Sequence, residues 1–204
     1  MIGGINIYCV KNIQTIEQLK DCPVFRIDHH QWIKDSMPLA YGKMALLGNS
    51  EIVVSMTAVE ANPLRRYTEN EDPVYKDSGL EAFFNFNPSM SKAYFNFEMN
   101  ANGALLSGYG ENRSRKTVSQ VSAWPAVCKA EIEEHSWSVL LHVPMELICE
   151  VYQREPLKTG DTFTCNFFKI SEDPSIEHYV SYMPVQSEFP NFHVPESFGD
   201  AIIC

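Results

Sequence analysis

Residues 94–100, YFNFEMN, alternate strictly between apolar side chains and polar or amphipathic ones. A hydrophobic period of two predicts a β-strand, because successive side chains of a strand point to opposite faces of the sheet. The preceding segment LEAFFNF, residues 80–86, alternates in the same way and predicts a neighbouring strand. Each strand is expected to bury one face in a core and to present a polar face on the other side.

Similar strand patterns recur along most of the chain, separated by turns rich in Gly, Pro, Asn and Asp. They lie at residues 5–10, 41–49, 51–62, 92–106, 136–144, 161–170 and in a short segment at the C-terminus. Short helical segments are expected over residues 14–22 and after Pro144. Many short strands with few helical periods are typical of a β-sandwich. We therefore predict an all-β fold in a single domain, residues 1–204, without internal repeats.

The composition supports a folded chain with a sizeable core, since 45% of the 204 residues are hydrophobic and 12% are aromatic. The formal net charge is −10. Nucleic-acid backbones and anionic membrane surfaces require clusters of Lys and Arg, so neither is an expected partner. Neutral ligands remain compatible with this charge, and the sequence does not indicate an oligomeric state.

The N-terminal segment does not have the pattern of a secretory signal, because it lacks a charged start and Asn, Lys and Gln interrupt its apolar residues. No apolar run approaches the length of a transmembrane helix. We therefore expect a cytoplasmic location, or an extracellular one if an export signal has been removed.

The cysteines show no short repeated spacing and no CxxC pair. They are Cys9, Cys22, Cys128, Cys149, Cys165 and Cys204. We expect reduced, partly buried thiols. The alternative is the disulfide framework of a secreted protein, which would suit a much shorter chain better.

Two carboxylates and a carboxamide are expected to share the polar face of the central strands. Glu81 lies in the first strand, and Asn96 and Glu98 lie in the second. Like charges side by side cost stability, which a ligand with many hydroxyl donors would offset. A sugar offers such donors, together with C–H faces that stack on aromatic rings. The alternative is an ordinary solvated face of an antiparallel sheet.

Three segments carry a resemblance to a known family. They are DPVYKDSGLEAFFNF, YFNFEMNANGALLSGYG and FPNFHVPESFGDAII. From about residue 20 to the C-terminus, the chain resembles the family 9 carbohydrate-binding modules. The resemblance implies an antiparallel β-sandwich of jelly-roll type with a few short helical turns. It also implies non-catalytic binding of a mono- or oligosaccharide, or of a polysaccharide chain end, between two aromatic platforms. Members are typically appended to xylanases and related glycoside hydrolases of carbohydrate catabolism.

The resemblance assigns roles to three residues. Glu81 falls on the family's ligand-binding glutamate, and Phe192 falls where the family has a stacking Trp. The second platform position holds Val74 with Tyr75 beside it, and Tyr75 is the better match. Both rings are smaller than Trp, so we expect weaker stacking.

Three further positions differ from the family pattern in charge. Asn96 and Glu98 stand where sugar-binding members have Arg and Asn, and His193 stands where the family has Arg. We therefore expect a site of altered specificity, or one that has lost its original ligand. The predicted substrate-binding residues are Tyr75, Glu81, Asn96, Glu98, Arg113, Phe192 and His193.

Other polar segments allow more than one interpretation. Arg113 and Arg115 could counter the acidic face, contact ligand hydroxyls or lie in a solvated loop. His29 and His30 suggest a metal, but adjacent strand residues point to opposite faces. The acid-rich residues 68–73 would suit a structural calcium ion or a solvated loop, and no cofactor is required.

The three tryptophans, Trp32, Trp124 and Trp137, are expected in the core. Trp137 is in phase with an apolar strand face, whereas Trp124 could instead line a ligand cleft.

Two alternative functions remain open. Glu81 and Glu98 could act as the acid and base of a glycoside hydrolase, or the chain could be an accessory subunit of one. A relative that has lost sugar binding and acts as an interaction protein is the third interpretation. No catalytic residue is assigned.

Overall fold

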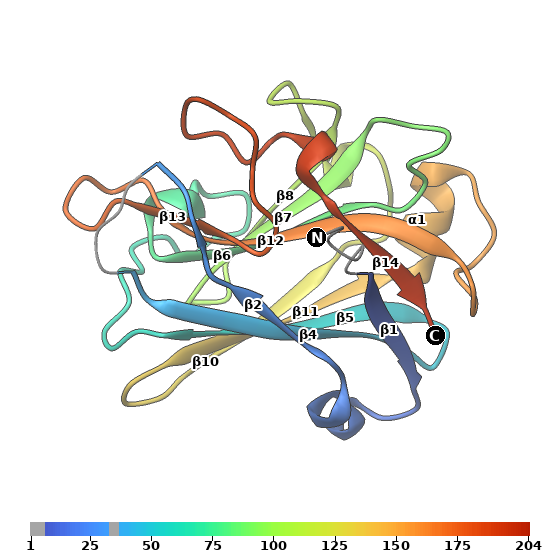
Figure 1. The fold of residues 1–204 in the computed structure, drawn as a ribbon, viewed down its shortest axis with the longest axis horizontal. Coiled ribbons are helices and arrows are strands. Elements are labelled where there is room, and N and C mark those ends of the chain that lie inside the picture. Colours follow the sequence, from blue (N-terminus) through green and yellow to red (C-terminus); the bar gives the residue numbers. More distant parts are fainter. Residues whose placement is uncertain (1–6, 33–36) are drawn as a thin grey trace, which may run out of the picture.

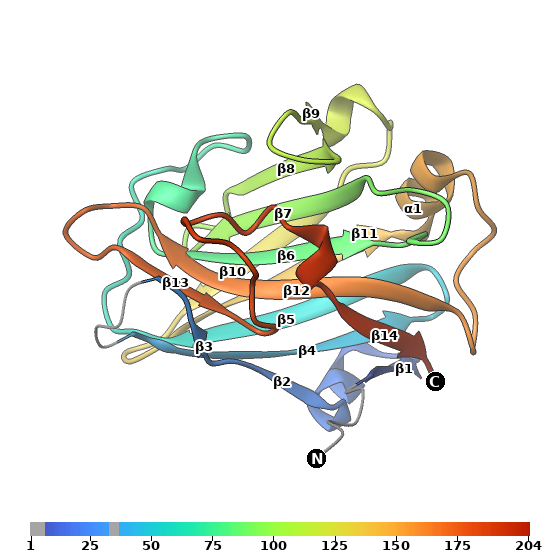
Figure 2. The ribbon, with the colours of Figure 1, turned by 45° about the horizontal axis from the view of Figure 1, so that its top comes forward.

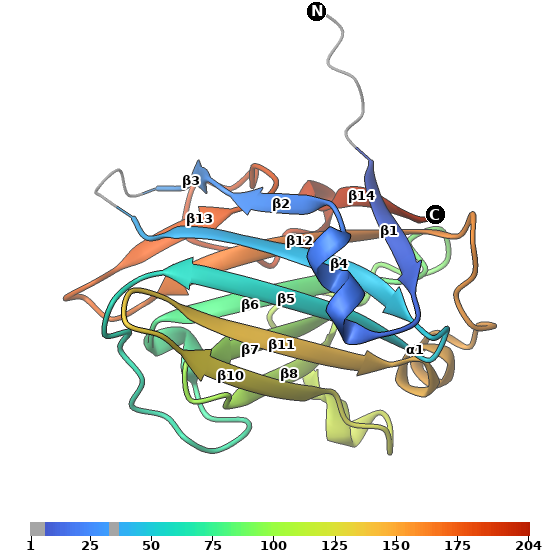
Figure 3. The ribbon, with the colours of Figure 1, turned by 90° about the horizontal axis from the view of Figure 1, so that it is seen from below.

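The computed structural model describes residues 7–32 and 37–204. They form a sandwich of two packed β-layers, which Figure 3 shows one behind the other. The first layer is antiparallel and consists of β10 (Val127–Ile132), β11 (Trp137–Pro144), β5 (Glu51–Val59), β4 (Leu39–Leu47) and β2 (Val24–Ile27), in that order.

The second layer lies across the core from the first (Figure 1). Its order is β14 (Gly199–Ile203), β12 (Thr162–Ser171), β6 (Gly79–Asn85), β7 (Tyr94–Asn100), β8 (Leu105–Gly110) and β9 (Lys116–Thr117). Two short strands extend it beside β12, namely β13 (His178–Ser181) and β3 (His29–His30). Pairing within this layer is antiparallel throughout the described residues.

Strand β1 (Tyr8–Ile13) connects the two layers. Its first half pairs in parallel with β14, where Tyr8 lies opposite Ala201. Its second half pairs in parallel with β4, where Lys11 lies opposite Ala45. One strand therefore closes the edge between the layers, and the predicted β-sandwich is confirmed.

The helical segments are short, as predicted. They are η1 (Ile16–Asp21), η2 (Val74–Lys76), η3 (Val118–Gln120), α1 (Met145–Tyr152) and η4 (Pro195–Ser197). The expected helix over residues 14–22 is a 3₁₀ helix that begins after Thr15, whose capping box with Gln18 satisfies free backbone N–H groups. No helix in the described residues is long and apolar enough to cross a bilayer.

The core between the layers is rich in aromatic rings. Trp137 is fully buried, as its phase in the sequence predicts. Phe25 stacks on Phe167 at 3.8 Å between ring centroids and 5° between planes. Gly42 lies beneath this stack, and a Cβ there would overlap the Phe25 ring and the Ser55 carbonyl. Glycine at this position therefore leaves room for the Phe25 ring, which packs on Phe167 of the other layer.

A buried ionic cluster also spans the core. Lys169 on β12 is fully buried, and its Nζ lies 3.4 Å from a Glu60 carboxylate oxygen. It also lies 2.6 Å from Ser78 Oγ and 2.8 Å from His178 Nε2. Trp137 Nε1 donates to the same Glu60 carboxylate at 2.9 Å. These contacts satisfy the charges, which would be costly in the interior if left alone.

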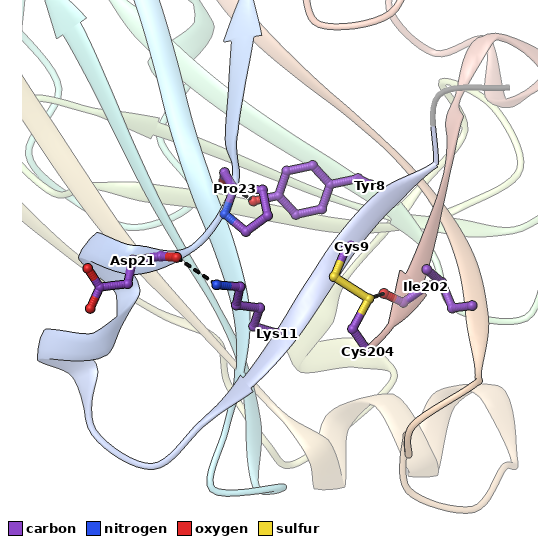
Figure 4. Close-up of a disulfide and its surroundings, with 7 residues drawn as sticks. All are labelled: Tyr8, Cys9, Lys11, Asp21, Pro23, Ile202 and Cys204. Atoms are coloured by element: carbon purple, nitrogen blue, oxygen red, sulfur yellow. Dashed lines mark hydrogen bonds between the residues drawn. A yellow bond between two sulfur atoms is a disulfide. The ribbon is translucent and has the colours of Figure 1, made fainter. Parts of the chain in front are cut away.

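The terminal cysteines correct the expectation that every thiol is reduced. Cys9 and Cys204 form a disulfide, with a Cα–Cα distance of 5.8 Å (Figure 4). The two residues lie 195 positions apart, but the pairing of β1 with β14 brings them together. No local spacing could reveal this bond. The free cysteines are Cys22, Cys128, Cys149 and Cys165.

The second face of β6 and β7 is also buried, so the alternative of an ordinary solvated face is wrong. All residues of both strands are buried. Figure 2 shows the C-terminal segment, in red, crossing this face of the sheet. A second apolar cluster forms beneath it, with Phe83, Phe168, Tyr179 and Phe192 among its members. The polar residues of this face therefore lie under a covering layer.

Candidate functional site

A pocket of about 250 Å³ opens between the covering segments and the β6–β7 face. The structure brings six of the seven predicted site residues together around it: Tyr75, Glu81, Glu98, Arg113, Phe192 and His193. The sequence did not indicate the other lining residues, which are Ile170, Glu172, Tyr179, Pro190 and Asn191.

Two carboxyl groups form the floor of this pocket. Glu81 of β6 and Glu98 of β7 lie directly opposite each other in the ladder, so both project to the same face. They are 3% and 5% exposed. Burial raises the pKa of Glu81 well above its usual range, and the charge of Glu98 raises it further. Burial also raises the pKa of Glu98, to about 7.

Asn96 lies beside Glu98 on the same face of β7 and does not line the pocket. Its Nδ2 donates a 2.7 Å hydrogen bond to Glu98 Oε1, which orients that carboxyl group. Its Oδ1 is buried without a hydrogen-bond partner among the described residues. Gly108 lies opposite Asn96 on β8, and a Cβ there would come within 2.5 Å of Asn96 Oδ1. Glycine at this position leaves room for the Asn96 side chain.

The other amides of this face fix loops. Asn100 Nδ2 donates to the Tyr67 carbonyl at 2.8 Å and to Asp77 Oδ2 at 2.9 Å. Asn85 Nδ2 donates to the Ser91 carbonyl at 2.7 Å. Asn85 and Asn100 therefore hold neighbouring loops in place, whereas Glu81 and Glu98 line the pocket.

Aromatic side chains form one wall. The Phe192 ring stacks on Phe168 at 4.1 Å with 17° between planes, and it is 5% exposed. Tyr179 and Trp32 contact other parts of the ring, with centroids at 5.9 and 5.5 Å. One face of Phe192 is thus covered by Phe168, so Phe192 is a fixed wall and not an open platform.

Three other aromatic residues are less buried than Phe192. Tyr75 lies in η2 and is half-buried, and its carbonyl accepts a 2.9 Å hydrogen bond from the Glu172 amide. This bond places Tyr75 and Glu172 side by side at the pocket. Trp32 is half-buried beside Phe192 and lies outside the sandwich core, in contrast to the prediction. Trp124 is 49% exposed and is not part of the core either.

His193 is a buried, hydrogen-bonded imidazole. Its Nδ1 lies 2.9 Å from the Tyr94 hydroxyl, and its ring packs on Phe83 at 5.1 Å between centroids. Burial lowers its pKa to about 3, and the charges of Arg115 and Arg113 act in the same direction. The imidazole is therefore neutral at physiological pH. If the phenol donates to Nδ1, Nε2 carries the proton and can donate to a ligand.

The two arginines after β8 hold backbone in place. Arg113 is exposed and donates to Asn191 Oδ1 at 3.3 Å and to the Pro190 carbonyl at 3.1 Å. Arg115 donates to the Tyr94 carbonyl at 2.7 Å and lies 4.3 Å above the ring centroid of the same tyrosine. Within the described residues neither arginine forms an ion pair. Their charges still act on the floor from a distance, because Arg113 opposes the raised pKa of Glu81 and Arg115 opposes that of Glu98.

The candidate metal segments have other contacts. In the described part of the chain, no group of three or more His, Cys, Asp or Glu side chains could hold a metal ion. Within residues 68–73, a Glu71 carboxylate oxygen accepts from Ser107 Oγ at 2.9 Å. Asp72 Oδ2 accepts from the Glu69 amide at 3.1 Å. His29 and His30 are exposed on β3.

The family model for carbohydrate-binding family 9 matches residues 15–203. No curated protein has a sequence that matches this chain. A Bacteroides uniformis protein to which carbohydrate binding is attributed has a similar fold, with 22% identity, a TM-score of 0.78 and coverage of 96% of this chain and 97% of the other.

Two structures of a family 9 module from Caldicellulosiruptor kristjanssonii also share the fold. The complex with cellotriose has 11% identity and a TM-score of 0.70, and covers 97% of this chain and 92% of the other. The complex with glucose has 12% identity and a TM-score of 0.69, and covers 97% and 95%. These structures share the fold of this chain, and the family model matches nearly its whole length. This chain belongs to carbohydrate-binding family 9.

Proposed function

We propose that this protein binds carbohydrate without catalysis, and that the pocket over β6 and β7 holds a mono- or oligosaccharide or the end of a polysaccharide chain. The observation that carries the proposal is the floor of the pocket, where Glu81 and Glu98 are buried without an ion pair in the described chain. Such acceptors suit the hydroxyl donors of a sugar.

The walls and rim of the pocket supply aromatic rings and hydrogen-bond donors for a sugar. Tyr75 would cover a C–H face of the sugar ring, and Phe192 and Tyr179 would form the aromatic wall beside it. His193 Nε2 would donate to a sugar oxygen, and Arg113 would contact hydroxyls at the rim. The volume of about 250 Å³ lies below that of drug-sized pockets, roughly 300–1,000 Å³, and therefore suits one sugar unit.

Membership in the family supports this proposal, and a family member from C. kristjanssonii was solved with cellotriose and with glucose. Association with a glycoside hydrolase in carbohydrate catabolism is a further part of the proposal.

Hydrolysis is the second candidate, since two buried carboxyl groups with raised pKa values resemble a glycosidase pair. Glycosidase carboxyls flank the scissile bond, whereas Glu81 and Glu98 rise from one floor on neighbouring strands. Both would lie on the same side of a bound ring. We therefore favour binding over hydrolysis.

Two further predictions concern the setting of the protein. The Cys9–Cys204 disulfide favours an oxidising compartment, and thus the extracellular alternative over the cytoplasmic one. Structural calcium in the loop of residues 68–73 remains a prediction, and thermal melts with calcium or EDTA would test it.

Titration calorimetry against gluco-, xylo- and amino-oligosaccharides tests the proposed function. We expect Glu81→Ala and Phe192→Ala each to weaken binding by about 1–3 kcal/mol, the range for losing a buried hydrogen-bonding or stacking partner. Glu134→Ala, at a carboxylate that is 88% exposed, is the matched control and should bind normally. Absence of heat with every sugar, in a folded protein, would reject the proposal and favour an interaction protein. Release of reducing ends would favour hydrolysis instead.

A further inference from the structure

We propose that the ligand of this pocket carries a positively charged amino group, which makes an amino sugar the expected substrate class. This inference rests on the proposed carbohydrate binding and specifies its ligand. The charges of the pocket lining carry it. Three carboxylates, those of Glu81, Glu98 and Glu172, line the pocket, and Arg113 is the one lining arginine in the described chain.

Glu81 is the residue that most clearly needs a partner. It is 3% exposed and lines the pocket, yet its carboxylate accepts no hydrogen bond and forms no ion pair within residues 7–32 and 37–204. A buried carboxylate without a donor is costly. The donor is therefore expected to come from the ligand.

The protein's own cations do not fill this role. The guanidinium of Arg113 is held by Asn191 and Pro190 at the rim. The guanidinium of Arg115 is held by backbone carbonyls and the Tyr94 ring. His193 is neutral at physiological pH because burial lowers its pKa to about 3. Arg113 and Arg115 act on Glu81 and Glu98 only through charge at a distance and contact neither carboxyl group in the described chain, so a direct positive partner is left for the ligand to supply.

An ammonium group matches the floor better than a hydroxyl does. It offers three donors and a full charge to two carboxylates that lie opposite each other in the ladder. A sugar hydroxyl donates one neutral hydrogen bond and supplies no charge to compensate the ionised pair. N-acetylation removes the charge and keeps the ring, so an N-acetyl sugar is the matched neutral probe.

The same groups give the binding a definite pH dependence. The charges that face Glu81 are those of Glu98, Glu172 and Arg113, and those that face Glu98 are Glu81, Arg115, Glu172 and Glu71. Burial raises the pKa of both floor carboxyls, so part of the pair is protonated at pH 7. An ammonium favours the ionised pair and releases a proton on binding. Affinity should therefore rise from pH 5 to pH 7.

The test is titration calorimetry of the full chain at pH 7 with glucosamine, N-acetylglucosamine and glucose, and with the β-1,4-linked dimers of each. We expect the amino sugar to bind about tenfold or more tightly than both neutral probes, as charge-assisted hydrogen bonds exceed neutral ones. In Glu81→Gln and Glu98→Gln, which keep the side-chain shape, the affinity ratio should fall towards one. Glu134→Gln should keep the full ratio. Titration in two buffers of different ionisation enthalpy should reveal the released proton.

Equal or tighter binding of the neutral probes would overturn this inference and leave the proposed function intact. A preference for the amino sugar that survives in both Gln variants would also overturn it, because groups other than Glu81 and Glu98 would then bind the ammonium group. Absence of heat with these probes and with the gluco- and xylo-oligosaccharides would overturn the inference and the proposed function together.

Discussion

Glu81 and Glu98 lie opposite each other in the β6–β7 ladder, both buried and neither in an ion pair within the described chain. Two like charges directly opposite each other on neighbouring strands destabilise a sheet, unless a proton or a ligand compensates the charge. The pair therefore couples the stability of the fold to pH and to the occupancy of the pocket.

Stability should fall as pH rises from about 4.5 through 7. The pKa of Glu98 is about 7 in the fold and near 4.5 when the chain is unfolded, so the folded state binds more protons between these values. The stabilisation is complete below pH 4.5 and is lost as pH rises through 7. We expect Glu98→Gln to remove about 2–3 kcal/mol of this dependence. Urea melts of both proteins from pH 5 to pH 8 measure it, with Glu134→Gln as control. Parallel pH curves for wild type and Glu98→Gln would contradict the prediction.

His193 should remain neutral through the physiological range. Burial and the nearby arginines lower its pKa to about 3, and the Tyr94 hydroxyl occupies Nδ1. Its ring resonances in an NMR titration should therefore stay constant from pH 5 to pH 8. Tyr94→Phe should release Nδ1 and weaken sugar binding by about 1 kcal/mol, the usual value of one hydrogen bond. Titration of His193 near pH 6.5 in the wild type would show that the ring is not buried in this way.

The Cys9–Cys204 disulfide should contribute strongly to stability. It closes a loop over 195 positions, so its removal frees nearly the whole unfolded chain. We expect Cys9→Ser to lose about 2–5 kcal/mol of the free energy of unfolding. Dithiothreitol should destabilise the wild type and leave Cys9→Ser unchanged, and Cys149→Ser should behave like the wild type.

Thiol counting gives an independent check of this bond. Alkylation in denaturant should label four cysteines before reduction and all six after it. Six labelled cysteines without reduction would exclude the disulfide.

Removing one partner of the buried Lys169–Glu60 pair should lower the free energy of unfolding. Glu60→Leu leaves the Lys169 ammonium without its carboxylate in the core, and we expect a loss of about 3–5 kcal/mol. Adding Lys169→Met should recover part of this loss, because an apolar pair leaves no buried charge. A double-mutant cycle in guanidinium chloride measures the coupling, and additive losses would contradict it.

Much of the fold and part of the site could be predicted from local patterns. The alternation over residues 94–100 and 80–86 sets which side chains share a face, because a strand has a side-chain period of two. It correctly placed Glu81, Asn96 and Glu98 on one face, and Trp137 in the core.

The covering layer could not be predicted in this way. Glu172 and Tyr179 line the pocket because β13 pairs with β12. Arg113 lines it beside the C-terminal segment, where it donates a hydrogen bond to Asn191. These contacts join segments that are far apart in the chain and leave no periodic signal. The burial of the polar face, and with it the raised pKa values of its carboxyls, follows from the same contacts.

The sequence by itself determined the strands, their buried faces and the family, because side-chain alternation and short motifs are local properties. Only the tertiary structure decided that Cys9 pairs with Cys204, that Asn96 donates to Glu98 without lining the pocket, and that Phe192 is a fixed wall. Each of these depends on the distance between residues that are remote in sequence, and such distances are set only when the two layers and their covering segments pack together.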